Sequence, residues 1–158
     1  MRVSLRWLAE YVELPELAPG ALAERLTLAG LEVEGLTELH AEGVRVGRIE
    51  AVEPHPHADN LKVCAVRVGQ EEFLTVCGAP NVAPGMLVPF ALPGARLGQG
   101  VLAETHIRGV RSAGMILSRE ELGFEEKSAG VWELPPDTPL GADLAQILEL
   151  PDLLLDLK

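Results

Sequence analysis

Two histidines and an aspartate form the cluster of this sequence that most resembles a reactive site. His55, His57 and Asp59 stand within one short stretch that also contains Pro56. Imidazole and carboxylate groups can bind a metal ion or move protons, but a metal site wants fixed geometry and usually a third ligand. The stretch also offers no nucleophile. We therefore interpret these residues as turn formers, and we predict neither a catalytic site nor a metal site.

Two cysteines and a glycine-rich stretch are the other patterns that could do chemistry. Cys64 and Cys77 have no His or Cys at the spacing of zinc ligands, so we interpret them as small apolar residues of strands, with a disulfide as the alternative. Residues 94–100 hold the glycines of a phosphate-binding loop, yet neither a Lys-Ser pair nor a helix pattern follows. Neither pattern predicts catalysis.

Short strands must position the polar residues between 55 and 118. Apolar runs there are separated by Gly, Pro and Asn, at intervals of roughly 8–15 residues. The expected strands lie at 44–52, 61–68, 72–76 and 86–92, with a broken fifth strand through 105–108 and 114–117. Such a set fits an OB-fold, which is a partly open five-stranded Greek-key barrel. The predicted fold class is mainly β with α+β flanks.

The flanks of the barrel show helical and strand patterns. Residues 5–12 and 19–29 have the apolar spacing of helices, and residues 31–36 alternate like a strand. Residues 140–150 predict a further helix, and residues 152–157 an apolar strand that could pair with 31–36.

This arrangement implies an inserted barrel. We expect a discontinuous and incomplete α+β domain formed by residues 1–41 plus 150–158. The barrel domain, with a C-terminal helical extension, then occupies residues 42–149. A capping box formed by Ser118 and Glu121 predicts a short helix at the start of that extension.

Charge is distributed unevenly along the chain. The formal net charge is −11, which argues against a nonspecific nucleic-acid binder because attraction to phosphate depends on Lys and Arg. The net charge is −5 over residues 1–43, +2 over residues 44–119 and −8 over residues 120–158. Any contact with RNA would therefore be confined to the middle, and it would be local and geometric.

The hydropathy of the chain and its first residues indicate where in the cell the protein is located. No apolar run reaches the roughly 18 residues that a membrane-spanning helix needs. The first residues lack the long apolar core of a signal peptide, since Glu10 and Glu13 interrupt them. We expect a cytoplasmic location and no membrane contact.

Several linked motifs resemble a known family. The middle of the chain is similar to the tRNA-binding OB-fold domain, of the EMAP-II-like type, that occurs in free-standing tRNA-binding proteins and in aminoacyl-tRNA synthetases. The matching motifs are residues 55–64 (HPHADNLKVC), 76–82 (VCGAPNV), 92–95 (LPGA) and 108–118 (RGVRSAGMILS). The flanking motifs 7–12 (WLAEYV), 26–34 (LTLAGLEVE), 120–123 (EELG) and 155–157 (LDL) resemble an N-terminal fragment of the bacterial phenylalanyl-tRNA synthetase β subunit.

The resemblance implies a role in tRNA aminoacylation. The family enzyme is an ATP-dependent ligase that uses magnesium, works as an (αβ)₂ assembly and has its catalytic site in the α subunit. The fragment would carry no cofactor and no catalytic residue, and would serve as an accessory tRNA-binding module. Its partners would be tRNA, the α subunit and the rest of β.

Seven residues are candidates for RNA contact. Lys and Arg would meet phosphates, while Asn and Ser would bond sugars or base edges. The candidates are Asn60, Lys62, Asn81, Arg108, Arg111, Ser112 and Met115.

Two other hypotheses remain open. The acidic flanks favour a structural OB-fold module that supports subunit or domain assembly and has little affinity for RNA. A free-standing tRNA-binding homodimer is a third possibility, against which the helical start of the chain argues.

Overall fold

The computed structural model describes residues 1–98 and 100–158, so Gln99, within the glycine-rich stretch, lies outside the described residues. The chain forms two compact units. Unit 1 comprises residues 1–40 and 149–158, and unit 2 comprises residues 41–148. Within the described residues, no helix is long and apolar enough to span a membrane.

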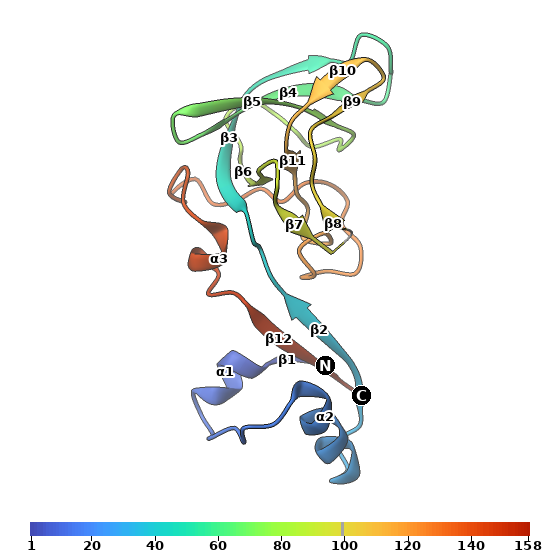
Figure 1. Ribbon diagram of the computed structural model, residues 1–158, viewed down its shortest axis with the longest axis vertical. Coiled ribbons are helices and arrows are strands. Elements are labelled where there is room, and N and C mark those ends of the chain that lie inside the picture. The colour runs from blue at the N-terminus through green and yellow to red at the C-terminus, as the bar shows by residue number, and fades with distance from the viewer. Residues whose placement is uncertain (99) are drawn as a thin grey trace. The chain divides into compact units, whose positions relative to one another are not determined.

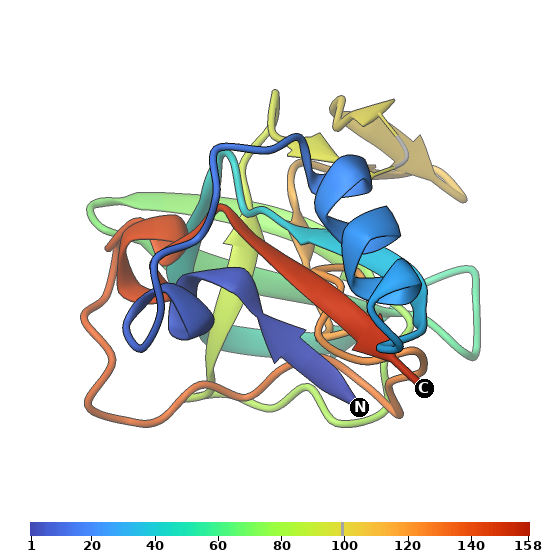
Figure 2. The ribbon, with the colours of Figure 1, turned by 90° about the horizontal axis from the view of Figure 1, so that it is seen from below.

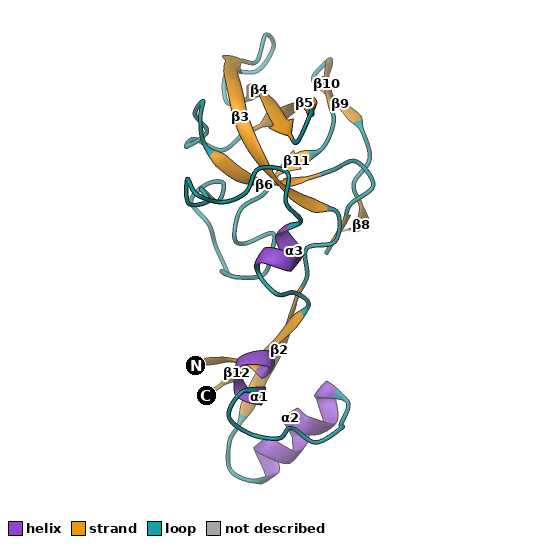
Figure 3. Ribbon diagram, turned by 90° about the vertical axis from the view of Figure 1, so that its left-hand side faces the viewer, coloured by secondary structure: helices purple, strands orange, loops and turns teal. Residues whose placement is uncertain are grey.

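A curled antiparallel sheet dominates unit 2 (Figures 1 and 3). Its five strands are β3 (Val44–Pro54), β4 (Lys62–Val68), β5 (Glu71–Cys77), β6 (Leu87–Ala91) and β11 (Met115–Ile116). The order across the sheet is β11-β6-β3-β4-β5, and every pair is antiparallel. The first strand therefore lies between the second and the fourth, as in a five-stranded Greek-key barrel. The predicted mainly β fold class with an OB-fold barrel is confirmed.

The curvature of β3 has two local causes. The register against β4 shifts between Ile49 and Ala51, and such a bulge bends the strand and increases its twist. Gly47 lies where a Cβ atom would be 2.6 Å from Cγ1 of Val66. Only glycine allows β3 to lie this close to the inner side chains of β4.

The barrel closes through the segment 112–114, which we call the closure segment. Its backbone lies beside β5: the Ala113 amide donates to the Leu74 carbonyl at 2.8 Å, and the Thr75 hydroxyl donates to the Gly114 carbonyl at 2.9 Å. Gly114 has a φ of +77°, and an added Cβ would be 2.3 Å from the Phe90 ring. Glycine is therefore required there for both conformation and space.

The core of the barrel consists of side chains from the inner faces of these strands. The buried cluster comprises Ile49, Cys64, Val66, Val68, Val82, Met86, Val88, Phe90, Ile116 and Val131. On β4 the buried positions alternate with partly exposed ones, as the period of a strand requires. Cys64 is thus a core residue, and both cysteines are free thiols, in agreement with the apolar-residue interpretation.

Two short hairpins occur in the sequence between β6 and β11. One pairs β7 (Arg96–Leu97) with β8 (Gly100–Val101), and the other pairs β9 (Thr105–Ile107) with β10 (Val110–Ser112). The broken fifth strand expected through 105–117 is therefore a hairpin followed by β11. The positive φ angles at positions 108 and 109 reverse the direction of the chain, and the expected single strand is therefore divided.

The helical extension is smaller than predicted. The Ser118 hydroxyl accepts from the Glu121 amide and the Glu121 carboxylate accepts from the Ser118 amide, as in a capping box, but the backbone that follows is a turn ending near Gly123 at φ +83°. The helix expected at 140–150 is reduced to α3 (Leu144–Ile147). Asp143 caps it by accepting a bond from the Ala145 amide, which sets its start later than the apolar pattern suggests.

Unit 1 contains a three-stranded antiparallel sheet in the order β1-β12-β2. Its strands are β1 (Arg2–Ser4), β12 (Asp152–Leu157) and β2 (Val33–Leu39), and its helices are α1 (Leu5–Ala9) and α2 (Pro19–Leu28). Figure 2 shows α2 alongside β2 and α1 beside β12. The predicted pairing of the last strand with the segment after α2 is confirmed. Strand β1 was not predicted, because three residues are too few to show a period.

Candidate nucleic-acid interface

One edge of the barrel is formed by the loop between β3 and β4 and by the β9–β10 hairpin. We call residues 55–61 and 104–111 the rim. His55 joins its two parts, because its Nε2 atom lies 2.9 Å from the Ile107 carbonyl oxygen. The His55 amide also donates to the Leu61 carbonyl at 3.0 Å and closes the base of the loop. The histidine thus shapes a turn, as predicted, and its link to the hairpin is an addition that the sequence analysis missed.

Two candidate residues project from the rim with their polar atoms unused. Asn60 lies in the loop and Arg108 at the hairpin tip, and both are exposed. Arg108 has a φ of 48° and Gly109 a φ of 85°, which is the backbone of a two-residue turn of type I′. Over residues 1–98 and 100–158, neither Asn60 nor Arg108 has a side-chain hydrogen bond or an ion pair within the chain. They are the candidates best placed to meet a ligand.

Arg111 is exposed but already engaged. Its Nε and Nη2 atoms donate to the two carboxylate oxygens of Glu104 at 2.5 and 2.9 Å. The hydrogen bond and the charge of Glu104 raise the pKa of Arg111, and Arg111 in turn lowers the pKa of the Glu104 carboxyl. A phosphate must compete with this carboxylate for the guanidinium. No local sequence pattern indicates this pair, because the two residues lie seven positions apart around a turn.

Two other candidates hold the barrel together. Ser112 is buried, and its hydroxyl accepts a bond from the Val76 amide at 3.0 Å and lies 3.3 Å from the Thr75 hydroxyl. The Asn81 side chain bonds both backbone groups of Val131, donating to its carbonyl at 2.9 Å and accepting from its amide at 3.0 Å. The polar atoms of both residues are therefore used in folding.

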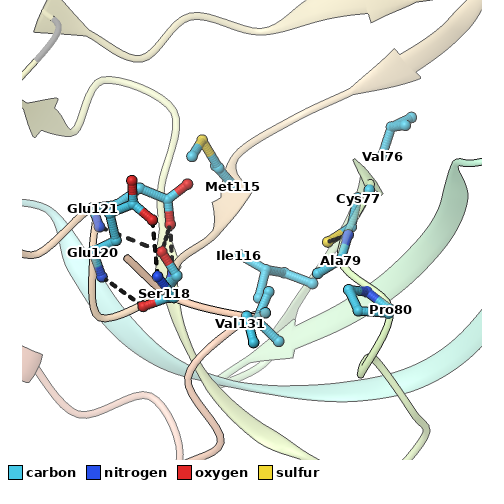
Figure 4. A pocket seen from close by; sticks show the side chains of 14 residues that line it. Val76, Cys77, Ala79, Pro80, Met115, Ile116, Ser118, Glu120, Glu121 and Val131 are labelled. Atoms are coloured by element: carbon cyan, nitrogen blue, oxygen red, sulfur yellow. Dashed lines mark hydrogen bonds between the residues drawn. The ribbon is translucent and has the colours of Figure 1, made fainter. Parts of the chain in front are cut away.

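Met115 lines a pocket at the end of β5, and Lys62 lies beside that end of the strand. Lys62 lies opposite Cys77 in the sheet, and its ammonium donates to the Pro80 carbonyl at 3.3 Å. Met115 lines the pocket, which has a volume of about 430 Å³ (Figure 4). Met115 also lines a neighbouring pocket of about 570 Å³ that extends along the β7–β8 hairpin. Lys62 directly follows the β3–β4 part of the rim in sequence, and Met115 belongs to β11.

The pocket beside Met115 has both apolar and acidic lining residues. Ile116 and Val131 are among the apolar ones, and Glu120 and Glu121 are the acidic ones (Figure 4). The Glu121 carboxylate accepts bonds from the amide and hydroxyl of Ser118, each at 2.5 Å. Fixed carboxylates disfavour a phosphate there.

The thiols of the barrel are poorly suited to nucleophilic chemistry. Burial raises the pKa of Cys64 to about 11, and burial also raises the pKa of Cys77. Both thiols therefore remain protonated at neutral pH, and the thiolate is the reactive form. In the part of the chain that the structure describes, no three His, Cys, Asp or Glu side chains are grouped to hold a metal ion.

In the described part of unit 2, four of the nine Lys and Arg side chains are paired with a carboxylate. Arg48 and Arg67 share Glu50, and Arg119 pairs with Glu125 while its guanidinium stacks on the Trp132 ring at 5.2 Å. Within the described residues of unit 2, those that form no ion pair are Arg45, Lys62, Arg96, Arg108 and Lys127. Arg96 and Arg108 both belong to the long connection between β6 and β11, so uncompensated positive charge accompanies the rim.

Comparison with known proteins gives concordant matches. Residues 44–143 match the family model described as "Putative tRNA binding domain". The chain is 50% identical over 167 residues to the phenylalanine–tRNA ligase beta subunit of Synechococcus sp. (strain JA-3-3Ab), and 48% identical over 159 residues to that of Hahella chejuensis. Each alignment covers 99% of this chain and 20% of the relative, so the chain spans about a fifth of the length of these relatives.

Solved structures were compared as well. A MetRS related protein from Pyrococcus horikoshii aligns over 81% of this chain and 97% of its own, with 21% identity and a TM-score of 0.47. The C-terminal domain of Plasmodium vivax p43 covers 64% of this chain, with 23% identity and the same TM-score. The family model spans the whole five-stranded sheet and both hairpins, and the chain therefore belongs to the tRNA-binding domain family.

Proposed function

We propose that this chain is the accessory tRNA-binding module of a phenylalanine–tRNA ligase β subunit. The observation that carries the proposal is the match of residues 44–143 to the tRNA-binding family over the same residues that form the five-stranded barrel. Identity of about half over nearly the whole chain to two such β subunits supports the choice of enzyme. The chain itself contributes binding and no catalytic residue.

The rim and the adjoining pocket are the proposed contact surface. Arg108 meets a phosphate, and Asn60 bonds a sugar or a base edge. Lys62 lies at the start of β4 and reaches a second phosphate, and Met115 offers an apolar surface to a base. This face corresponds to the second and third strands and the loops L12 and L45, through which OB-folds bind oligonucleotides.

Three candidates act close to the RNA in a different way. Ser112 anchors the base of the hairpin that carries Arg108, Asn81 holds Val131 within the fold, and Arg111 offers a guanidinium that is shared with Glu104. The predicted set is therefore divided into residues that touch the RNA and residues that fix the shape of the surface.

The proposal also assigns the two domains of the chain and their partners in the enzyme. Residues 42–149 serve as the tRNA-binding domain, and residues 1–41 with 150–158 form part of a discontinuous α+β domain. The partners are the rest of β and the α subunit in an (αβ)₂ assembly in the cytoplasm. ATP and magnesium act at a catalytic site outside this chain.

Fluorescence anisotropy with a labelled tRNA(Phe) transcript, at two salt concentrations, tests the proposal. Arg108→Gln is expected to weaken binding severalfold and to reduce the salt slope by about one. Arg48→Gln is the matched control, because it removes the same charge from a residue already paired with Glu50. Salt-independent binding, or equal loss in both variants, would contradict the proposed surface. A chain that bound the synthetase subunits but no tRNA would instead be an assembly module.

A further inference from the structure

The hydrogen-bond partners of His55 determine its tautomer. The side chain is buried, with 6% of its surface exposed. Its Nε2 atom faces the Ile107 carbonyl at 2.9 Å, and its Nδ1 atom faces the His57 amide at 3.0 Å. A carbonyl can only accept and an amide can only donate, so Nε2 carries the proton and Nδ1 has the free lone pair. The ring is therefore a neutral imidazole that uses both nitrogens within the rim.

These two bonds connect segments that are distant in sequence. His57 belongs to the same loop as His55, whereas Ile107 precedes the turn of the β9–β10 hairpin, 52 residues away. Each strand of that hairpin has only three residues, and an isolated two-stranded hairpin is marginally stable in water. Anchors outside the hairpin are needed to fix its direction.

Contacts outside the hairpin hold both of its ends. At its base, the Ser112 hydroxyl accepts a bond from the Val76 amide of β5. Near its tip, the Ile107 carbonyl accepts a bond from His55. Arg108 follows Ile107 directly, and Asn60 lies in the loop whose base His55 closes. One side chain thus controls the placement of both exposed candidates.

We propose that His55 is a positioning residue, whose Nε2–H tautomer joins the β3–β4 loop to the β9–β10 hairpin and presents Asn60 and Arg108 together to tRNA. The second half of this statement rests on the proposed tRNA-binding function, whereas the first half concerns the free protein. His55 itself is buried and does not touch the RNA.

Two substitutions of His55 test its two hydrogen bonds one at a time, because each substitution retains only one of them. Glutamine places its amide nitrogen the same number of bonds from Cα as Nε2, so His55→Gln keeps a donor for the Ile107 carbonyl. Asparagine places its amide oxygen the same number of bonds from Cα as Nδ1, so His55→Asn keeps an acceptor for the His57 amide and loses the link to the hairpin. Both variants replace the ring by a carboxamide, which makes them matched controls for each other.

The first measurement concerns the free chain. Backbone hydrogen exchange over residues 105–110 is expected to be faster in His55→Asn than in the unsubstituted chain, and close to the unsubstituted rate in His55→Gln. The imidazole nitrogen shifts in an NMR spectrum are expected to show a protonated Nε2 and an unprotonated Nδ1. The opposite tautomer, or equal exchange in the two variants, would overturn the link.

The second measurement is tRNA(Phe) binding by anisotropy. His55→Asn is expected to bind about tenfold more weakly, because one lost hydrogen bond frees the hairpin, while His55→Gln stays within about twofold of the unsubstituted chain. Equal affinity in all three proteins, or equal loss in both variants, would overturn the positioning role. Failure of the unsubstituted chain to bind tRNA would reject the proposed function and this role together, while the exchange rates would still decide whether His55 joins the loop to the hairpin.

Discussion

The barrel and the rim of unit 2 carry the same residue types and use them differently. In the barrel, the Asn81 amide and the Ser112 hydroxyl are consumed by backbone groups of Val131 and Val76. At the rim, Asn60 and Arg108 are exposed, and within the described residues they have no side-chain partner in the chain. Buried polar groups must form hydrogen bonds within the protein, whereas exposed polar groups at an edge remain available to a ligand. The chemical type of a residue therefore does not decide whether it can contact a ligand. What decides it is whether the hydrogen-bonding groups of its side chain are still unused in the folded chain.

Glycine at positive φ gives the largest expected contrast between the two regions. Gly114→Ala places a Cβ within 2.3 Å of the Phe90 ring and 2.7 Å of the Ala91 carbonyl oxygen, and it should lower the free energy of unfolding by about 3 kcal/mol. Gly109→Ala at the hairpin tip meets nothing within 4 Å, so only the conformational penalty of about 1 kcal/mol remains. Urea unfolding of the two variants measures the difference. Equal losses would show that the closure segment relaxes and that the barrel is less rigid than its contacts imply.

The two asparagines give the next contrast. Asn81→Ala leaves the amide and carbonyl of the buried Val131 without their partners, and should destabilise the chain by about 2 kcal/mol. Asn60→Ala should change stability by less than about 0.5 kcal/mol, because its side chain is exposed. Binding of tRNA should show the reverse order, with affinity reduced in the Asn60 variant and retained in Asn81→Ala at temperatures where that variant is folded. A stability loss at Asn60, or a binding loss confined to Asn81, would remove the distinction between barrel and rim.

The sequence predicts the barrel well, because the barrel depends on local patterns. The alternating segments 44–52 and 61–68 form β3 and β4. The last strand pairs with the strand after α2, as the apolar residues of both segments predict. Where tertiary contacts outweigh local preference, prediction fails. Ser118 and Glu121 form capping bonds without a helix, since the chain turns instead near Gly123.

Prediction of the site is weaker for a different reason. The sequence identifies Asn81, Arg111 and Ser112 as polar residues near expected turns, but it does not reveal which of their atoms are already bonded. The partners of Asn81 lie 50 residues away, and His55 and Ile107 are 52 residues apart. No local pattern encodes such pairs. They depend on the order of strands in the sheet, which only the folded chain displays.

The two arginines of the rim give the smallest expected effect. Arg108 is unpaired within the described residues, whereas Arg111 is held by Glu104. Glu104→Gln should therefore release Arg111 and raise tRNA affinity about twofold at neutral pH, since an exposed ion pair is weak. Glu71→Gln, which removes the same charge from β5, is the control, and an equal gain in that variant would show a general charge effect.

The pH dependence of this ion pair follows from the lowered pKa of Glu104. Because its folded pKa lies below the ordinary value of 4.5, the pair stabilises the fold above that pH, and this contribution is lost as the pH falls through the lowered pKa. In a carbon-detected NMR titration of the free chain, the Glu104 carboxyl should therefore titrate at lower pH than that of an exposed Glu without an ion pair. In Arg111→Gln the Glu104 pKa should return toward 4.5, because the largest cause of its shift is the hydrogen bond from Arg111. An unchanged Glu104 titration in that variant would mean that Arg111 is as free as Arg108, and the rim would then present both guanidinium groups to the RNA.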